Sequence, residues 1–271
     1  MAVWQTGSVQ GGGSARGCRR PYAVARSEVQ GTVSAGPRRH RFHRADGRET
    51  RRAGFPPARE VTAMFDMTKV VANALGEQLA LTYQRTFGSR EPRYAEIIEA
   101  SARLMIERIV GSDALYHDGD HTTLVTLVAQ DILRGRFLQQ GVTPEDWLHM
   151  IVAALYHDIG YVRGVCSGDR ADAFVVDAQG TTVSLPRGAS DAALAFYHIE
   201  RSKLAVQERF GTHDLVDAGR VIRAIELTRF PVPEDDEHRE TGTEAGLMRA
   251  ADLIGQLGDP LYPRKLNALF Y

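Results

Sequence analysis

From residue 66 onward, apolar residues recur at spacings of three and four, which places them on one face of an α-helix. Strands and helices do not alternate, so the pattern excludes a parallel sheet. Residues 64–271 are therefore predicted to form one all-α domain. The helices expected from the spacing and from their start and stop residues cover about 68–88, 92–110, 120–139, 143–158, 191–210, 214–228, 242–257 and 260–270.

Two segments of this domain have a more specific local pattern. Thr143-Pro144-Glu145-Asp146 forms a capping box with proline at the first helical position, and the apolar run MIVAALY at 150–156 predicts a central, buried helix. Residues 174–185, FVVDAQGTTVSL, instead alternate β-branched and polar residues around a glycine-containing turn. This second segment predicts a small β-hairpin insertion.

The first 60 residues have a different composition from the rest of the chain. They hold twelve arginines, no lysine and four acidic residues, a net charge of +8 in a chain whose total is −1. With little apolar surface to offset the entropy of ordering, residues 1–63 are predicted to be a disordered tail. The tail is open to three interpretations: a polyanion-binding segment, a transit peptide, or a wrongly assigned start, because Met64 and Met67 lie where helical patterning begins.

Several classes of protein are excluded by composition. Two cysteines, Cys18 and Cys166, exclude a disulfide scaffold and a CxxC zinc site. No run approaches the roughly 18–20 apolar residues that span a bilayer, and no signal peptide opens the chain, so a cytoplasmic protein without a membrane partner is expected. The near-zero net charge argues against nucleic acid as a partner of the whole chain. No Gly-rich phosphate loop or GxSxG elbow occurs.

Four ionisable residues lie where apolar residues are expected. His157 and Asp158 end the apolar helix in LYHDIGY, His121 opens a helix with an apolar continuation, and Asp252 interrupts the apolar stretch AADLIGQL. Burying such groups is costly unless a cation or partner charges compensate them. Two imidazoles and two carboxylates suit one divalent cation: Zn, Mn, Fe, Co, Ni or Mg. A hydrogen-bonded core histidine and a simple helix end are the alternatives.

The order His, His-Asp, distant Asp resembles the HD superfamily of metal-dependent phosphohydrolases, over most of residues 115–270. YHDGDHTTLV at 116–125 is similar to the YHNxxHxxxV segment of cyclic-nucleotide phosphodiesterases, and RAADLIGQ offers the small-residue setting of the last ligand. The resemblance implies an HD-domain helical bundle whose metal ligands are His121, His157, Asp158 and Asp252. It also implies hydrolysis of a phosphate ester or anhydride by metal-activated water, with a nucleotide as the expected substrate.

The resemblance further implies candidates for proton transfer and phosphate binding. His117 precedes His121 by four residues and is the candidate general acid, with a solvated loop residue as the alternative. Arg163, in GYVRG, is the candidate phosphate ligand, because many HD enzymes have a lysine near the turn where this chain has Tyr161; a surface arginine is the alternative. Weaker candidates for the substrate rim are Arg201, Lys203 and Arg187.

A second site remains open at His198. This residue opens a helix much as a second-metal histidine does in dinuclear members of the superfamily, and Glu226 would complete or orient that site. The paired histidines and the GYP segment of HD-GYP phosphodiesterases are absent from the chain. One or two metals are therefore expected, with contact to phosphate as the other role for His198. Two other functions stay open: a di-iron oxygenase, and a non-catalytic ligand sensor. The oligomeric state is not predicted.

The remaining histidines of the domain are expected to be structural or solvated. His149 is predicted to lie on the exposed side of its helix or to pack against it, and His213 to cap a helix. His238, in the acidic sequence EDDEHRE, is predicted to be solvated. Cys166 follows the His-Asp turn in a glycine-rich loop and is a candidate reactive thiol.

Overall fold

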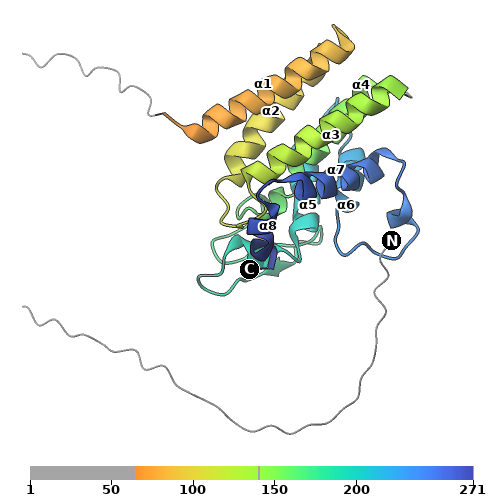
Figure 1. Ribbon diagram of the computed structural model, residues 1–271. Coiled ribbons are helices and arrows are strands. Elements are labelled where there is room, and N and C mark those ends of the chain that lie inside the picture. Colours follow the sequence, from red (N-terminus) through yellow and green to blue (C-terminus); the bar gives the residue numbers. More distant parts are fainter. Residues whose placement is uncertain (1–64, 140, 271) are drawn as a thin grey trace, which may run out of the picture. The chain divides into compact units, whose positions relative to one another are not determined.

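The computed structural model describes residues 65–139 and 141–270 (Figure 1). These residues are mostly helical, which confirms the predicted all-α class, and the predicted tail at 1–63 lies outside them. Within the described part, no helix is both long enough and apolar enough to cross a membrane. The helices are α1 (Met67–Phe87), α2 (Pro92–Ile109), α3 (Gly119–Gln139), α4 (Pro144–Tyr156), α5 (His198–Phe210), α6 (Ala218–Glu226), α7 (Glu244–Gly258) and α8 (Tyr262–Lys265).

Helix α4 is the centre of the fold, as its sequence predicts. Thr143 Oγ1 accepts from the Asp146 amide at 3.1 Å, and the Asp146 carboxylate accepts from the Thr143 amide at 2.9 Å. Every residue from Trp147 to Tyr156 is buried. Helices α2, α3, α6 and α7 all contact α4. A helix that is apolar on all sides has to be surrounded in this way.

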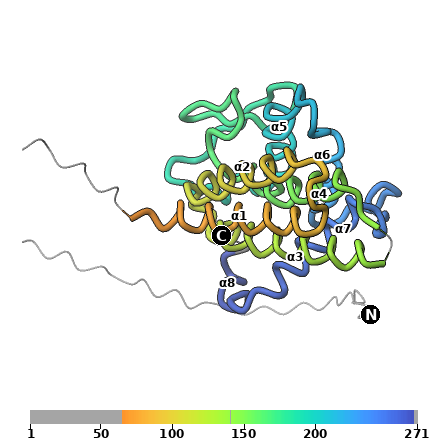
Figure 2. The backbone as a smooth tube through the Cα atoms, turned by 90° about the horizontal axis from the view of Figure 1, so that it is seen from above, coloured from red at the N-terminus to blue at the C-terminus, as the bar shows by residue number. Residues whose placement is uncertain are grey.

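The first two helices form an antiparallel pair beside this centre (Figure 2). Helix α1 begins earlier than the sequence predicts, because the Asp66 carboxylate, and not Thr68, accepts the Lys69 amide at 3.3 Å. At the turn, the Tyr83 hydroxyl donates to the Arg90 carbonyl at 2.9 Å. Ile98 and the other buried residues of α2 then join the core around α4.

The insertion after α4 contains the predicted hairpin. Strands β1 (Phe174–Val175) and β2 (Thr182–Val183) pair antiparallel, with Phe174 opposite Val183. The turn uses Gly180 at φ 80°, a left-handed conformation that favours glycine. The helix predicted over 191–210 is in fact divided into a 3₁₀ segment, Asp191–Leu194, and α5.

The C-terminal helices are also shorter than the sequence predicts. Asp217 caps α6 by accepting the Gly219 amide at 2.8 Å, so this helix begins at Ala218 and not near residue 214. The helix predicted over 260–270 is likewise divided, into α8 and a 3₁₀ segment, Leu266–Phe270. Capping side chains and turn geometry set these ends, and the apolar spacing does not reveal them.

Candidate metal centre

Three elements far apart in sequence bring four ionisable side chains together. His121 lies in the first turn of α3, His157 and Asp158 follow α4, and Asp252 lies on α7. Helix α3 packs against both α4 and α7, which fixes these elements relative to one another. His121, His157 and Asp158 have exposed fractions of 3%, 1% and 3%, so the cluster lies within the protein. The Asp252 side chain, 18% exposed, connects it to solvent.

The distances between donor atoms match those between ligands of one cation. Asp158 Oδ2 lies 3.1 Å from His157 Nε2 and 3.3 Å from His121 Nε2. Asp252 Oδ1 lies 3.7 Å and 3.4 Å from the same two nitrogens, which are themselves 3.4 Å apart. Metal–ligand bonds of roughly 2.0–2.2 Å place neighbouring donors about 3.0–3.5 Å apart. Four of the five distances lie in this range, and the 3.7 Å between Asp252 Oδ1 and His157 Nε2 is slightly longer. Two sets of residues that share His121 could therefore hold a metal ion: His121, His157 and Asp252, and His117, His121 and Asp158.

The orientation of the His157 imidazole supports this arrangement. Its Nδ1 lies 2.8 Å from the Ala154 carbonyl oxygen, which can only accept, so Nδ1 carries the hydrogen. In the neutral ring the Nε2 lone pair then points at His121 Nε2. Two imidazole nitrogens facing each other need a proton or a cation between them. The donor set of two imidazoles and two carboxylates suits a divalent transition metal or zinc.

Carboxylates also determine the protonation of His121 in the metal-free protein. Burial lowers its pKa, but hydrogen bonds to Asp158 and Asp252 outweigh burial and raise the pKa from 6.5 to about 10. In the absence of a cation, the negative charge of the two carboxylates is thus balanced by protons on the imidazoles. A metal that binds here has to displace those protons.

This raised pKa predicts a pH dependence of stability. In EDTA, the melting temperature is expected to fall as the pH rises from 6.5 to about 10. The pKa of His121 is 6.5 in the unfolded chain and about 10 in the folded protein, so the stabilisation by its proton is complete below pH 6.5 and is lost as the pH rises to about 10. Thermal denaturation across this range measures the effect. His121→Gln should flatten the slope. A wild-type melting temperature that rises with pH over the range would contradict the assignment.

His117 and His198 face the same carboxylate from other directions. His117 precedes α3, so it does not share a helical face with His121, yet its Nδ1 lies 2.8 Å from Asp158 Oδ2. His198 is the first residue of α5, and its Nε2 lies 3.8 Å from Asp158 Oδ1. Oδ2 of Asp158 is therefore shared among three imidazoles, and Oδ1 faces that of His198.

Tyr161 packs against both of these histidines and was not identified as a site residue from the sequence. Its ring lies 4.4 Å from the His117 ring at 13°, and 4.6 Å from the His198 ring at 19°. It is 4% exposed. Tyr161 lies three residues after Asp158. A turn that follows a buried pair brings the next side chains near that pair, so this position could have identified Tyr161 from the sequence.

Gly160 allows α5 to approach this turn. A Cβ at Gly160 would overlap the backbone carbonyl of His198. The Gly160 amide donates to Ser202 Oγ at 2.9 Å, and Ser202 Oγ donates to the His157 carbonyl at 2.7 Å. The glycine after the His-Asp pair thus places His198 at the cluster.

Two predicted site residues have structural partners instead. Arg163 Nε lies 2.6 Å from Asp191 Oδ1, and its guanidinium also donates to the Ala189 carbonyl. Glu226 accepts from Lys203 Nζ at 2.7 Å and from the Arg229 guanidinium. Although burial raises the Glu226 pKa, these cations lower it to about 2.

Three weaker expectations are wrong. His238 is buried and not solvated, because its loop folds so that Nδ1 contacts Asp235 at 2.7 Å. Arg201 is 0% exposed and lies inside the protein, not on a substrate rim. Cys166 is also buried, which raises the pKa of its thiol to about 12 and makes it a poor nucleophile.

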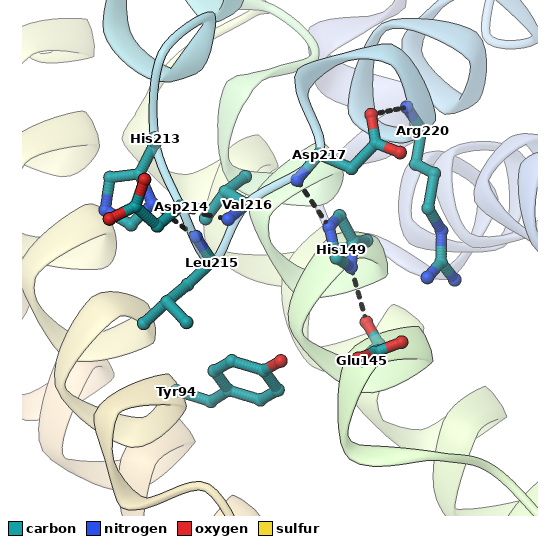
Figure 3. Close-up of a pocket in the computed structure, with 9 residues that line it drawn as sticks. All are labelled: Tyr94, Glu145, His149, His213, Asp214, Leu215, Val216, Asp217 and Arg220. Carbon is teal, nitrogen blue, oxygen red and sulfur yellow. Dashed lines mark hydrogen bonds between the residues drawn. The ribbon is translucent and has the colours of Figure 1, made fainter.

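His149 and His213 line a separate pocket of about 330 Å³ (Figure 3). His149 Nδ1 donates to the Glu145 carbonyl at 2.6 Å, and Nε2 accepts from the Asp217 amide at 2.8 Å. His213 Nδ1 accepts from the Leu215 amide at 3.1 Å. Both imidazoles hold backbone in place, so both are structural. His213 does not cap α6 as predicted, because the cap of that helix is Asp217.

Fold and site together define an all-α protein with a buried His/Asp cluster that could hold a metal ion. The chain belongs to the Npun_R2479-like family, whose model matches residues 65–271. Among curated proteins no match is found. Solved structures likewise give no match.

Proposed function

We propose that the protein is a metal-dependent phosphohydrolase of the HD type, which hydrolyses a phosphate ester or anhydride, with nucleotides as the first substrate class to test. The observation that carries this proposal is the spacing of the His121, His157, Asp158 and Asp252 donor atoms, at 3.1–3.7 Å in the five pairs measured. A divalent cation bound there lowers the pKa of water toward neutrality and polarises a phosphoryl oxygen.

His117 is the candidate proton donor to the leaving oxygen. Its Nδ1 donates to Asp158 Oδ2 at 2.8 Å, which orients the ring and leaves Nε2 to exchange a proton with a bound substrate. The side chain is 22% exposed, so a substrate can reach it. Asp158 therefore has two roles: it holds the cation and it positions the acid.

His198 is the candidate second-metal or phosphate ligand. Its Nδ1 donates to the Ala195 carbonyl at 2.6 Å, which leaves Nε2 facing Asp158 Oδ1 at 3.8 Å. Burial lowers its pKa and favours the neutral ring. A lone pair and a carboxylate oxygen that face each other favour a cation or a phosphate hydroxyl between them. The partners of Glu226 make it an indirect contributor at most.

A phosphatase screen tests the proposed function. Nucleotides, cyclic nucleotides and simple phosphomonoesters are incubated with the protein and with Mn, Mg, Ni, Co, Zn or Fe, and phosphate release is measured with and without EDTA. The expected result is metal-dependent release that EDTA abolishes. Two irons per chain with oxygen uptake and no phosphate release would instead favour an oxygenase. Binding of a nucleotide that persists in EDTA without turnover would favour a sensor.

Tyr161 is expected to position His117 and His198. Tyr161→Leu removes the stacked ring and should lower kcat by about tenfold with little change in KM, because the proton donor loses its orientation. Tyr161→Phe keeps the ring and should retain most of the activity. Tyr161→Leu should also shift the limb of the pH–rate profile that reports the general acid, His117. A packing defect alone would leave this limb in place. Equal activity of both variants with wild type would contradict this role.

A further inference from the structure

A second pocket, of about 320 Å³, lies between α1 and α3, which run side by side (Figures 1 and 2). The α1 residues that line it follow helical spacing and share one face. The rings of Phe87 and Phe137 meet edge to face at 5.5 Å, which joins the C-terminal ends of the two helices. The lining residues are Gln78, Thr82, Arg85, Thr86, Gln130 and Arg134.

The charge of this pocket is entirely positive. Arg85 and Arg134 both line it, and no carboxylate does. Within residues 65–139 and 141–270, Arg85 has no ion pair, and Arg134 has only Asp131, at 3.0 Å. Both members of that pair are more than half exposed, so its contribution is small. Two guanidinium groups on one pocket wall favour a dianion, and a phosphate monoester matches them bidentately.

Two polar residues that line the pocket, Gln130 and Thr86, have acceptor oxygens that a ligand can use. Gln130 is 4% exposed, and its Oε1 is buried without a hydrogen-bond partner. Leaving such a group unpaired is costly. The Thr86 hydroxyl donates to the Thr82 carbonyl at 2.9 Å, so its oxygen is still able to accept. These groups match the hydroxyls of an organic ligand.

We infer that the α1–α3 pocket binds a small, hydroxyl-bearing phosphate ester, with the phosphate on Arg85 and Arg134 and the hydroxyls toward Gln130 and Thr86. The pocket volume is within the range of small-molecule sites. Gln130 lies nine residues after His121 on the same helix, about 13 Å along its axis. This site is therefore separate from the candidate metal centre and does not depend on the function proposed for it.

Isothermal titration calorimetry of the full-length protein in EDTA tests the inference, with ribose 5-phosphate as the probe. One probe molecule per chain is expected to bind, and the double variant Arg85→Gln/Arg134→Gln should weaken binding at least tenfold. Arg93→Gln, which removes one exposed arginine outside the pocket, is the matched control and should bind as wild type does. Both pocket arginines are exposed, so their replacement should leave the fold intact.

Two further arms separate the parts of the ligand. Ribose and inorganic phosphate should each bind at least tenfold more weakly than ribose 5-phosphate. Gln130→Leu should weaken the binding of ribose 5-phosphate and leave that of inorganic phosphate unchanged. Absence of binding, or binding that the double variant leaves unchanged, would overturn the inference. Inorganic phosphate that binds as tightly as the ester would overturn the assigned hydroxyl contacts.

Discussion

The variant Asp158→Asn is expected to lose metal binding and phosphate release together. The carboxylate contacts three imidazoles through Oδ2, at 2.8 Å from His117, 3.3 Å from His121 and 3.1 Å from His157. Burial alone would raise its pKa, but the imidazoles hold it well below the usual value, so the group is a carboxylate. An amide keeps the volume and removes the charge and one acceptor oxygen.

The expected loss in metal affinity is more than about a hundredfold, since even residues that only support a ligand contribute up to that amount. Metal content after dialysis and phosphate release on the best substrate are the two measurements. Asp259→Asn is the matched control: Asp259 is also buried but pairs with Lys265 at 3.2 Å, outside the donor set. Turnover that survives in Asp158→Asn would reject the proposed mechanism, and metal loss without loss of turnover would reject metal dependence.

The helical fold was predictable because its signals are local. The capping box at Thr143 and the apolar run that follows it specify α4 within about a dozen residues, and both are found as predicted. The ends of other helices were less predictable. Asp66 and Asp217 displace the predicted starts of α1 and α6, since several nearby side chains are able to cap and packing decides among them.

The candidate centre was predictable for a related reason. An ionisable side chain within an apolar helix signals compensation by a partner. This applied to His121, His157, Asp158 and Asp252, which the structure brings together. A charged residue on a loop can pair with a residue far away in the sequence, and the residues around it do not indicate which one.

Arg163 and His238 illustrate this limit. Arg163 pairs with Asp191, which lies on the other side of the insertion. His238 is buried, and its Nε2 lies 3.4 Å from Glu226 Oε1 of α6. Nothing in the sequence near either residue indicates these contacts.

Arg201 is the largest buried group whose role the sequence did not indicate. Its guanidinium is fully buried and forms a two-pronged pair with Asp169, with both nitrogen–oxygen distances at 2.9 Å. It also donates to the carbonyls of Gly160 at 2.7 Å, Val162 at 2.9 Å and Val175 at 2.6 Å. One side chain of α5 thus joins the turn after Asp158 to strand β1 of the insertion.

The variant Arg201→Met is expected to lower the free energy of unfolding by about 3–5 kcal/mol, because it leaves a buried carboxylate and three carbonyls without their donor. Urea denaturation measures the loss. Arg201→Met/Asp169→Leu removes the uncompensated charge and should recover part of the stability. Because Arg201 binds the turn that carries Gly160, the single variant should also weaken metal binding without touching any donor atom. If Arg201→Met is as stable as wild type, the pair of Arg201 and Asp169 does not hold the insertion in place. If the variant is unstable but binds metal as tightly as wild type, the turn that carries Gly160 does not affect the metal centre.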